Sequence, residues 1–180
     1  MTKLHIIGLL KGNHFEFTSY LATLNETQFC TAKAGKWSPG QQLEHLVRSV
    51  APLAQALMLP KFIPGLLFGK SNRPSRTFNE QVAHYQSKLA NGGKATGKYI
   101  PNAVIFEQRD ALIAKLNHSL EKLSLQLNSF SETDLDRLLL PHPLLGKLTL
   151  REMLFFTIYH VQHHHQSIEQ ARLDATFSGR

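Results

Sequence analysis

Apolar residues recur at helical spacing in four segments of this chain. The first covers about residues 12–25, and the second begins near residue 39. Leucine-rich stripes mark the third segment, residues 103–127, and the fourth, which follows Thr149. No stretch alternates between apolar and polar residues over a useful length, so no β-strand is expected. The pattern predicts an all-α fold, a bundle of four long helices in a single domain that spans residues 1–180.

Two of the predicted helices have clear start signals. Ser38 is followed three residues later by Gln41, with proline between them at the first helical position. Thr149 and Glu152 have the same spacing before the last helix. A hydroxyl residue followed at this distance by Glu or Gln is typical of a capping box, in which both side chains bond to backbone N–H groups. We therefore expect the second and last helices to begin at these residues.

A long connection, residues 60–102, separates the second and third helices. It is rich in Gly, Pro, Ser, Asn and Lys, with a short helix expected around residues 78–89. A connection of this length inside one domain is unusual, and it can carry the chain back along the bundle. The second and third helices then run parallel, which gives an up-down-down-up topology with a long crossover.

The crossover also holds most of the net charge of +7. Residues 61–98 contain seven basic side chains and one acidic side chain, Glu80. Such a segment can attract nucleic acid or anionic substrates. However, the sequence has no basic helix face with interleaved aromatics and no recognisable nucleic-acid motif. We therefore interpret the segment as a solvated connection and do not expect nucleic acid as a partner.

Composition is that of an ordinary globular protein, with 42% hydrophobic and 18% charged residues. The early apolar run, residues 6–10, is too short to cross a bilayer and lacks the features of a secretory signal. Cys30 is the only cysteine, which excludes an internal disulfide and a cysteine-based zinc site. We interpret Cys30 as a small core residue. These features fit a cytoplasmic protein without a membrane partner.

The histidines near the C-terminus are the strongest chemical feature. His160 and His164 lie four residues apart, so they share one face of the last helix. Such a pair can bind one metal ion, and a third histidine from another helix would leave coordination positions open. A hydrogen-bonded pair in a core is the more frequent outcome of this spacing, and both interpretations stay open. His163 flanks the pair, and we expect it to be packed or hydrogen-bonded there, with a proton-shuttling role as the alternative. We expect His142 to shape the preceding loop, with an approach to the rim of the site as the alternative.

The position of His45 is less clear from the pattern. On a helical wheel it lies about 140° from the leucine stripe of the second helix. The wheel alone therefore does not direct this side chain towards the core. Glu44, the adjacent carboxylate, points about 100° away from His45, and the sequence identifies no catalytic acid or base.

Two stretches resemble the DinB/YfiT-like superfamily, in particular its DinB-like group. The first is WSPGQQLEHL, residues 37–46; the second comprises HPLLGKLT, residues 142–149, and YHVQHHHQSI, residues 159–168. The resemblance implies a four-helix bundle with up-down-down-up topology, commonly a homodimer. It also implies a divalent metal ion, zinc or nickel in many members, held by three histidines that correspond to His45, His160 and His164. The family's usual Gln before the final Ile is replaced by Ser167.

The resemblance implies an enzyme that acts on a small molecule. The predicted reaction is transfer of a low-molecular-weight thiol onto a small electrophilic substrate, with the thiol supplied by a cofactor or substrate. Hydrolysis by metal-bound hydroxide is the first alternative, because a metal ion can also lower the pKa of bound water. A non-enzymatic, stress-related metal-binding module is the second.

Overall fold

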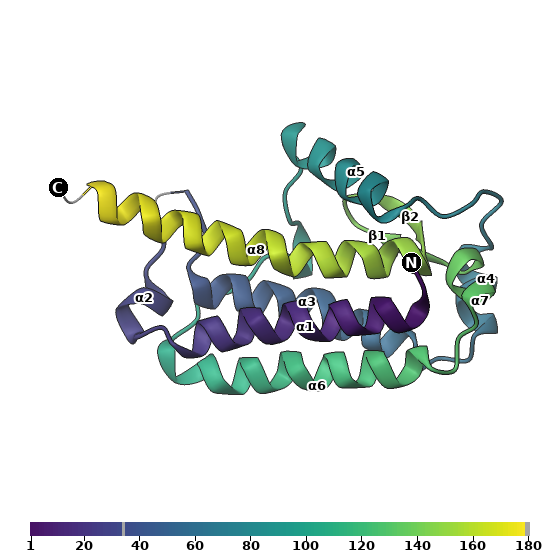
Figure 1. The fold of residues 1–180 in the computed structure, drawn as a ribbon, viewed down its shortest axis with the longest axis horizontal. Helices are drawn as coiled ribbons and strands as arrows, with labels where there is room; N and C mark the ends of the chain where they lie inside the picture. The colour runs from purple at the N-terminus through teal and green to yellow at the C-terminus, as the bar shows by residue number, and fades with distance from the viewer. Residues whose placement is uncertain (34, 179–180) are drawn as a thin grey trace.

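Four long helices form the body of the molecule (Figure 1). They are α1 (Lys3–Ala22), α3 (Pro39–Ala56), α6 (Arg109–Leu127) and α8 (Leu150–Ser178). The computed structural model describes residues 1–33 and 35–178, with side chains up to residue 173. In Figure 1, α1 and α8 run in one direction, and α3 and α6 run in the other. The predicted four-helix bundle with up-down-down-up topology is therefore confirmed.

The bundle core consists of the apolar faces of these four helices. Helix α3 packs most extensively on α6, and α1 packs on α8 and α6. The largest fully buried side chains include Phe17 of α1, Leu46 of α3, Leu123 of α6 and Phe155 of α8. By contrast, α3 and α8 make few contacts with each other along the backbone. The seam between α3 and α8 therefore has room between the two backbones for large side chains from both helices.

Both predicted capping boxes are present. The Ser38 hydroxyl accepts a hydrogen bond from the Gln41 backbone, and the Gln41 side chain accepts one from the Ser38 backbone. At the start of α8, the Thr149 N–H donates to Glu152 Oε2 over 2.9 Å, and the Glu152 N–H donates to Thr149 Oγ1 over 3.2 Å. These reciprocal bonds satisfy N–H groups that a helix start otherwise leaves unpaired.

Two helix starts were predicted wrongly. Helix α1 begins at Lys3, far before residue 12, because Thr2 caps it and Ile6 and Leu10 continue its buried face. Helix α6 begins at Arg109, after residue 103, because a 3₁₀ turn occupies Phe106–Gln108 (η2) immediately before it. In both cases the apolar pattern located the helix, but it gave no reliable signal for the first residue.

A short β-hairpin precedes α8, and the sequence pattern did not predict it. Strands β1 (Leu139–His142) and β2 (Gly146–Thr149) pair antiparallel, with His142 opposite Gly146. Gly146 has a φ of +75°, a conformation that glycine adopts without strain. Strands of four residues are too short to show alternation, which explains why the pattern missed them.

The crossover contains the remaining short elements between α3 and α6. These are α4 (Phe62–Phe68), α5 (Phe78–Ala90) and the 3₁₀ turn η1 (Gly97–Tyr99). The predicted short helix is α5, which packs against the outside of α8. In Figure 1 the crossover leaves one end of the bundle and returns to the other.

Buried Glu152 anchors the crossover to the start of α8. Arg73 binds both of its carboxylate oxygens, at 2.5 and 2.9 Å, and the Arg76 guanidinium contacts Oε1 at 3.2 Å. Burial alone would raise the pKa of Glu152, but Arg73 and the bound backbone N–H groups hold it below its ordinary value. Arg73 and Arg76 of the basic segment are therefore accessible to solvent and also have a structural role, which the sequence did not predict.

Two small helices complete the fold. Helix α7 (Glu132–Arg137) follows α6, and α2 (Glu26–Cys30) follows α1. A Cβ atom on Gly40 would lie 2.7 Å from the Phe29 ring, so the glycine allows α2 to approach α3 closely. Cys30 is exposed, and its interpretation as a core residue is therefore wrong. None of the described helices combines the length and hydropathy needed to cross a membrane.

Candidate metal centre

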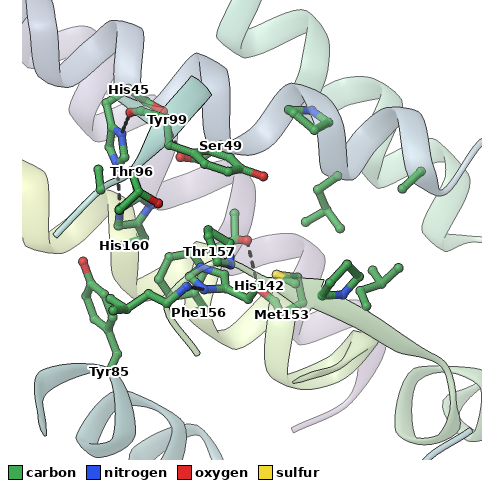
Figure 2. Close-up of a pocket in the computed structure, with 18 of the residues that line it drawn as sticks. His45, Ser49, Tyr85, Thr96, Tyr99, His142, Met153, Phe156, Thr157 and His160 are labelled. Carbon is green, nitrogen blue, oxygen red and sulfur yellow. Dashed lines mark hydrogen bonds between the residues drawn. The ribbon is translucent and has the colours of Figure 1, made fainter. Parts of the chain in front are cut away.

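The structure brings the three predicted histidines together across the seam between α3 and α8. His45 comes from α3, and His160 and His164 come from successive turns of α8. The Nε2 atom of His160 lies 3.1 Å from that of His45 and 3.0 Å from that of His164. All three side chains are buried, with 4–7% of their surface exposed. Figure 2 shows His45 and His160 facing each other at one end of a cavity.

His45 is buried although the wheel placed it away from the leucine stripe. Helix α3 has a second covered face, because the crossover turn η1 lies over it. The ring Nδ1 of His45 donates a hydrogen bond to the Tyr99 carbonyl oxygen over 2.7 Å. The wheel considered only the bundle core, so it could not show that a distant segment covers this face.

Hydrogen bonds fix the ring orientation of two of the histidines. His45 donates from Nδ1 to Tyr99, as described above, and His164 donates from Nδ1 to Oε1 of Gln42 over 2.9 Å. The Gln42 amide is itself oriented, because its Nε2 donates to the Trp37 carbonyl oxygen over 3.2 Å. With Nδ1 protonated, Nε2 of a neutral imidazole carries a lone pair. Both lone pairs therefore face the Nε2 atom of His160.

Burial keeps these imidazoles neutral at physiological pH. It lowers the pKa of His160 and His164 well below the ordinary value, and the neighbouring histidines lower them further. Burial also lowers the pKa of His45, against a smaller opposing effect of its bond to Tyr99. Neutral imidazole is the form that binds metal ions. His45 and His164 therefore present their Nε2 ligand atoms without prior loss of a proton.

The geometry fits a divalent ion. Three nitrogens each about 2.0–2.1 Å from a tetrahedral metal lie about 3.3 Å apart. The observed separations of 3.0 and 3.1 Å are close to this value, and the ligand atoms all lie within 4.8 Å of one another. In such sites the Nδ1–H group of each ligand histidine usually donates to a carbonyl or carboxylate oxygen, which orients the ring. Gln42 and the Tyr99 carbonyl would supply these acceptors for a bound ion.

Aromatic rings hold the histidines from both sides. Trp37 lies nearly parallel to His164, with an interplanar angle of 11° and ring centroids 6.3 Å apart, and its ring is 4.9 Å from His45. Phe156 stacks on His160 with centroids 4.6 Å apart. These contacts restrict the rotation of the imidazoles and so preorganise their nitrogens.

A cavity of about 260 Å³ opens beside the histidines. His45 and His160 form part of its wall, and the rest comes from α3, the crossover, the hairpin and α8 (Figure 2). The lining is mostly apolar, with Leu53, Met153 and Phe156 among its members. A small molecule in this cavity would therefore lie directly against two of the three candidate ligands.

Several residues of the site were missed by sequence reasoning. Gln42 lies three residues before His45, so it shares that face of α3, and this spacing could have identified it. It gives His164 an acceptor although the family's usual Gln is Ser167 here. Tyr85 of α5 lies 6.0 Å from His160 between ring centroids. No local pattern marks Tyr85, because only the path of the crossover places it here.

His163 and Glu44, two further residues considered from the sequence, have packing and structural roles. His163 packs against Tyr85 and Tyr159, as expected. Glu44 binds Arg48 and the Asn102 backbone N–H, so it serves the crossover and not the histidine cluster.

His142 serves both the loop and the cavity. It does bond within the loop, but it also lines the cavity beside the histidine cluster. The alternative, that His142 approaches the rim of the site, therefore holds together with its role in the loop.

Comparisons with known proteins agree with the fold. Among solved structures, the chain is similar to TT2238, described as a four-helix bundle protein, at 15% sequence identity and a TM-score of 0.57. The likeness covers 94% of this chain and 99% of that chain, and it shows the fold alone. No curated protein matches the sequence. The family model of the DinB superfamily matches residues 10–168, which is most of the sequence. This chain therefore belongs to the DinB superfamily.

Proposed function

We propose that this protein is a divalent-metal-dependent enzyme in which His45, His160 and His164 hold zinc or nickel. One observation carries the proposal: three buried, neutral imidazoles converge through Nε2 at the wall of an apolar cavity. A hydrogen-bonded core pair would not need a third histidine from another helix. Three protein ligands also leave a position open for a reactant, as catalytic sites require.

The proposed reaction is transfer of a low-molecular-weight thiol onto a small electrophilic substrate. When bound, a divalent ion would supply Lewis acidity that lowers the pKa of a thiol or of water. A free thiol is far more acidic than water, so a metal-bound thiol needs less help from a protein base to lose its proton. Among the described residues, no aspartate or glutamate lines the cavity. This lining supports the transferase over the hydrolase.

The protein's own residues would orient the reactants and exclude water. Phe156 and Met153 provide an apolar surface on which the body of a substrate can lie. Tyr85 lines the cavity. Burial raises the pKa of its hydroxyl, so the hydroxyl stays protonated at neutral pH. Tyr85 can donate a hydrogen bond to a bound molecule, but it does not act as a base.

The test is a turnover assay with untagged protein loaded with zinc or nickel. A panel of thiols is combined with an aryl halide, an epoxide and an unsaturated carbonyl compound. We expect turnover that needs both metal and added thiol and that disappears in His164→Ala. Cys30→Ser is the matched control, because it removes the protein's only thiol; it should leave turnover unchanged.

Other outcomes would redirect the assignment. Metal-dependent turnover of ester or amide substrates without thiol would identify a hydrolase. Metal binding without turnover of any class would favour the non-enzymatic metal-binding module.

A further inference from the structure

His142 occupies a place in the cavity that the metal proposal does not use. It ends strand β1, and its ring meets Phe156 edge to face with centroids 4.4 Å apart. Figure 2 shows it in the same cavity as His160, but it comes from the hairpin and not from the seam between α3 and α8. Its ring therefore lines the cavity without belonging to the histidine cluster.

The hairpin turn determines which nitrogen of His142 carries the proton. Nδ1 lies 3.1 Å from the backbone N–H groups of both Leu144 and Leu145 and accepts from them. A nitrogen that accepts two hydrogen bonds has no proton, so the neutral ring carries its proton on Nε2. Burial lowers the pKa of His142 to about 4, which keeps the ring neutral at pH 7.

The Nε2–H group of His142 is a donor left free for a ligand. Within the part of the chain that the structure describes, Nε2 makes no hydrogen bond. Two hydroxyls of the lining are already used: Ser49 donates to the His45 carbonyl oxygen over 2.8 Å, and Thr157 donates to that of Met153 over 2.9 Å. The Tyr85 hydroxyl likewise has no acceptor among the described residues, and Figure 2 shows it on the His160 side of the cavity.

The cavity thus offers donors and positive charge but no carboxylate. Lys94 lines it at an exposed position. The neighbouring Gly93 lies against the hairpin turn, since a Cβ atom there would be 2.7 Å from Leu144 Cδ1. Lys94 therefore enters the cavity near the turn that carries His142. A ligand that satisfies these groups must bring oxygen acceptors and negative charge on an apolar body.

We propose that His142 is a specificity-determining residue whose Nε2–H binds an oxygen of a small apolar carboxylate, with Lys94 balancing the charge. This inference rests on the proposed function, because it names the substrate class of the same site. The apolar part of the ligand lies on Phe156, and its other end reaches His45 and His160. The hairpin has a direct role in this arrangement, because its turn fixes the donor nitrogen of His142.

The test uses 3-phenylpropionate as probe, with 3-phenylpropanol and 3-phenylpropylamine as neutral and cationic analogues. Binding is measured by calorimetry on the full-length, metal-free protein, so that direct ligation to a metal cannot contribute. We expect the carboxylate to bind at least about tenfold more tightly than either analogue. In ¹⁵N NMR spectra, the His142 Nε2–H resonance should shift on addition of the carboxylate.

Two substitutions separate the donor from the structural role of the ring. His142→Asn places an oxygen near Nδ1, so it can still accept from the turn, but it lacks the donor at Nε2. His142→Gln places an amide N–H near Nε2 but loses the acceptor of the turn. We expect Asn to keep the thermal stability and lose the preference for the carboxylate, and Gln to retain more of that preference than Asn.

Equal binding of the three probes to the wild type, or an unchanged preference in His142→Asn, would overturn the inference. Zinc uptake is measured on the same preparations. Failure to bind zinc with the carboxylate preference intact would remove the metal proposal alone. Zinc binding without any carboxylate preference would remove the inference about His142 alone.

Discussion

At the scale of the residue, Gln42 orients the ring of the candidate ligand His164. Its Oε1 holds the Nδ1–H of His164, while its Nε2 is held by the Trp37 carbonyl oxygen. Without this acceptor, the His164 ring could rotate or place its proton on Nε2. Groups that orient a ligand histidine typically contribute 10–100-fold to metal affinity.

We therefore expect Gln42→Leu to weaken zinc or nickel binding by about 10–100-fold. Gln42→Glu is the matched control, because a carboxylate at this position still accepts from Nδ1, and it should stay within a few-fold of the wild type. Trp37 provides the readout: it is the only tryptophan and stacks beside His164 and His45, so bound nickel should quench its fluorescence. An unchanged affinity in Gln42→Leu would show that Gln42 does not support the site.

His14 of α1 is a second informative residue, far from any proposed chemistry. It is fully buried, and its Nδ1 bonds to the Leu10 carbonyl oxygen over 2.8 Å. Burial lowers its pKa to about 4, from an ordinary 6.5. Because the unfolded chain binds the proton more readily, this histidine's contribution to stability is present above pH 6.5. It is lost as the pH falls towards 4.

Replacing His14 with Met should accordingly make the protein less sensitive to acid. The wild type should lose about 2 kcal/mol more unfolding free energy than His14→Met between pH 7 and pH 5. Urea titrations at both pH values measure the difference. His118→Met is the control, since it removes a histidine from an exposed position. Identical pH profiles for His14→Met and the wild type would contradict the argument.

At the scale of the element, the sequence predicted the helix starts that depend on residues close together in the chain. Ser38 with Gln41 marked the start of α3, and Thr149 with Glu152 marked the start of α8. Both are capping boxes, which depend on two residues three positions apart. The hairpin was missed because pairing of four-residue strands depends on a turn and on the neighbours that cover it. The clamp of Arg73 on Glu152 was missed for a similar reason, because it joins residues far apart in the sequence.

The clamp gives a prediction for the crossover. Glu152→Gln keeps the size of the side chain but removes the charge that Arg73 and Arg76 bind. Loss of hydrogen bonds to a charged group should lower the unfolding free energy by about 2 kcal/mol. Hydrogen exchange around residues 73–76 should also become faster. In Glu80→Gln, which affects only the exposed cap of α5, the loss should be smaller. Equal losses in the two variants would argue against the clamp.

At the scale of the whole molecule, the candidate centre lies where the bundle has few other contacts. Helices α3 and α8 touch little along the backbone, and the three histidines bridge this seam. An ion bound there would join the two helices in the folded state only. A ligand that binds only the folded state at about 100 times its Kd adds about 2.7 kcal/mol to stability.

Zinc or nickel should therefore raise the melting temperature by roughly 5–10 °C under those conditions. A chelator should reverse the increase, and His45→Ala should show none. Calorimetry with and without metal measures both effects. If metal raises the melting temperature of His45→Ala as much as that of the wild type, the ion binds at another site.

The sequence predicted the bundle and the three histidines by different routes. Helical periodicity gave the four helices and the crossover. The spacing of His160 and His164 placed them on one face of the last helix, whereas the wheel left His45 outside the core. Only the resemblance to the superfamily selected His45. The physical reason is η1, which covers this face of α3 from more than fifty residues away. The homodimer and the reaction stay predictions.

The most direct measurement is the metal content of untagged protein by elemental mass spectrometry, beside His45→Ala and His164→Ala. We expect about one zinc or nickel ion per chain in the wild type and a loss of that ion in both variants, with the helical circular dichroism spectrum retained. Wild-type protein that holds no metal after incubation with zinc and nickel and removal of the excess would contradict it. The converging histidines would then be a structural feature of the bundle core.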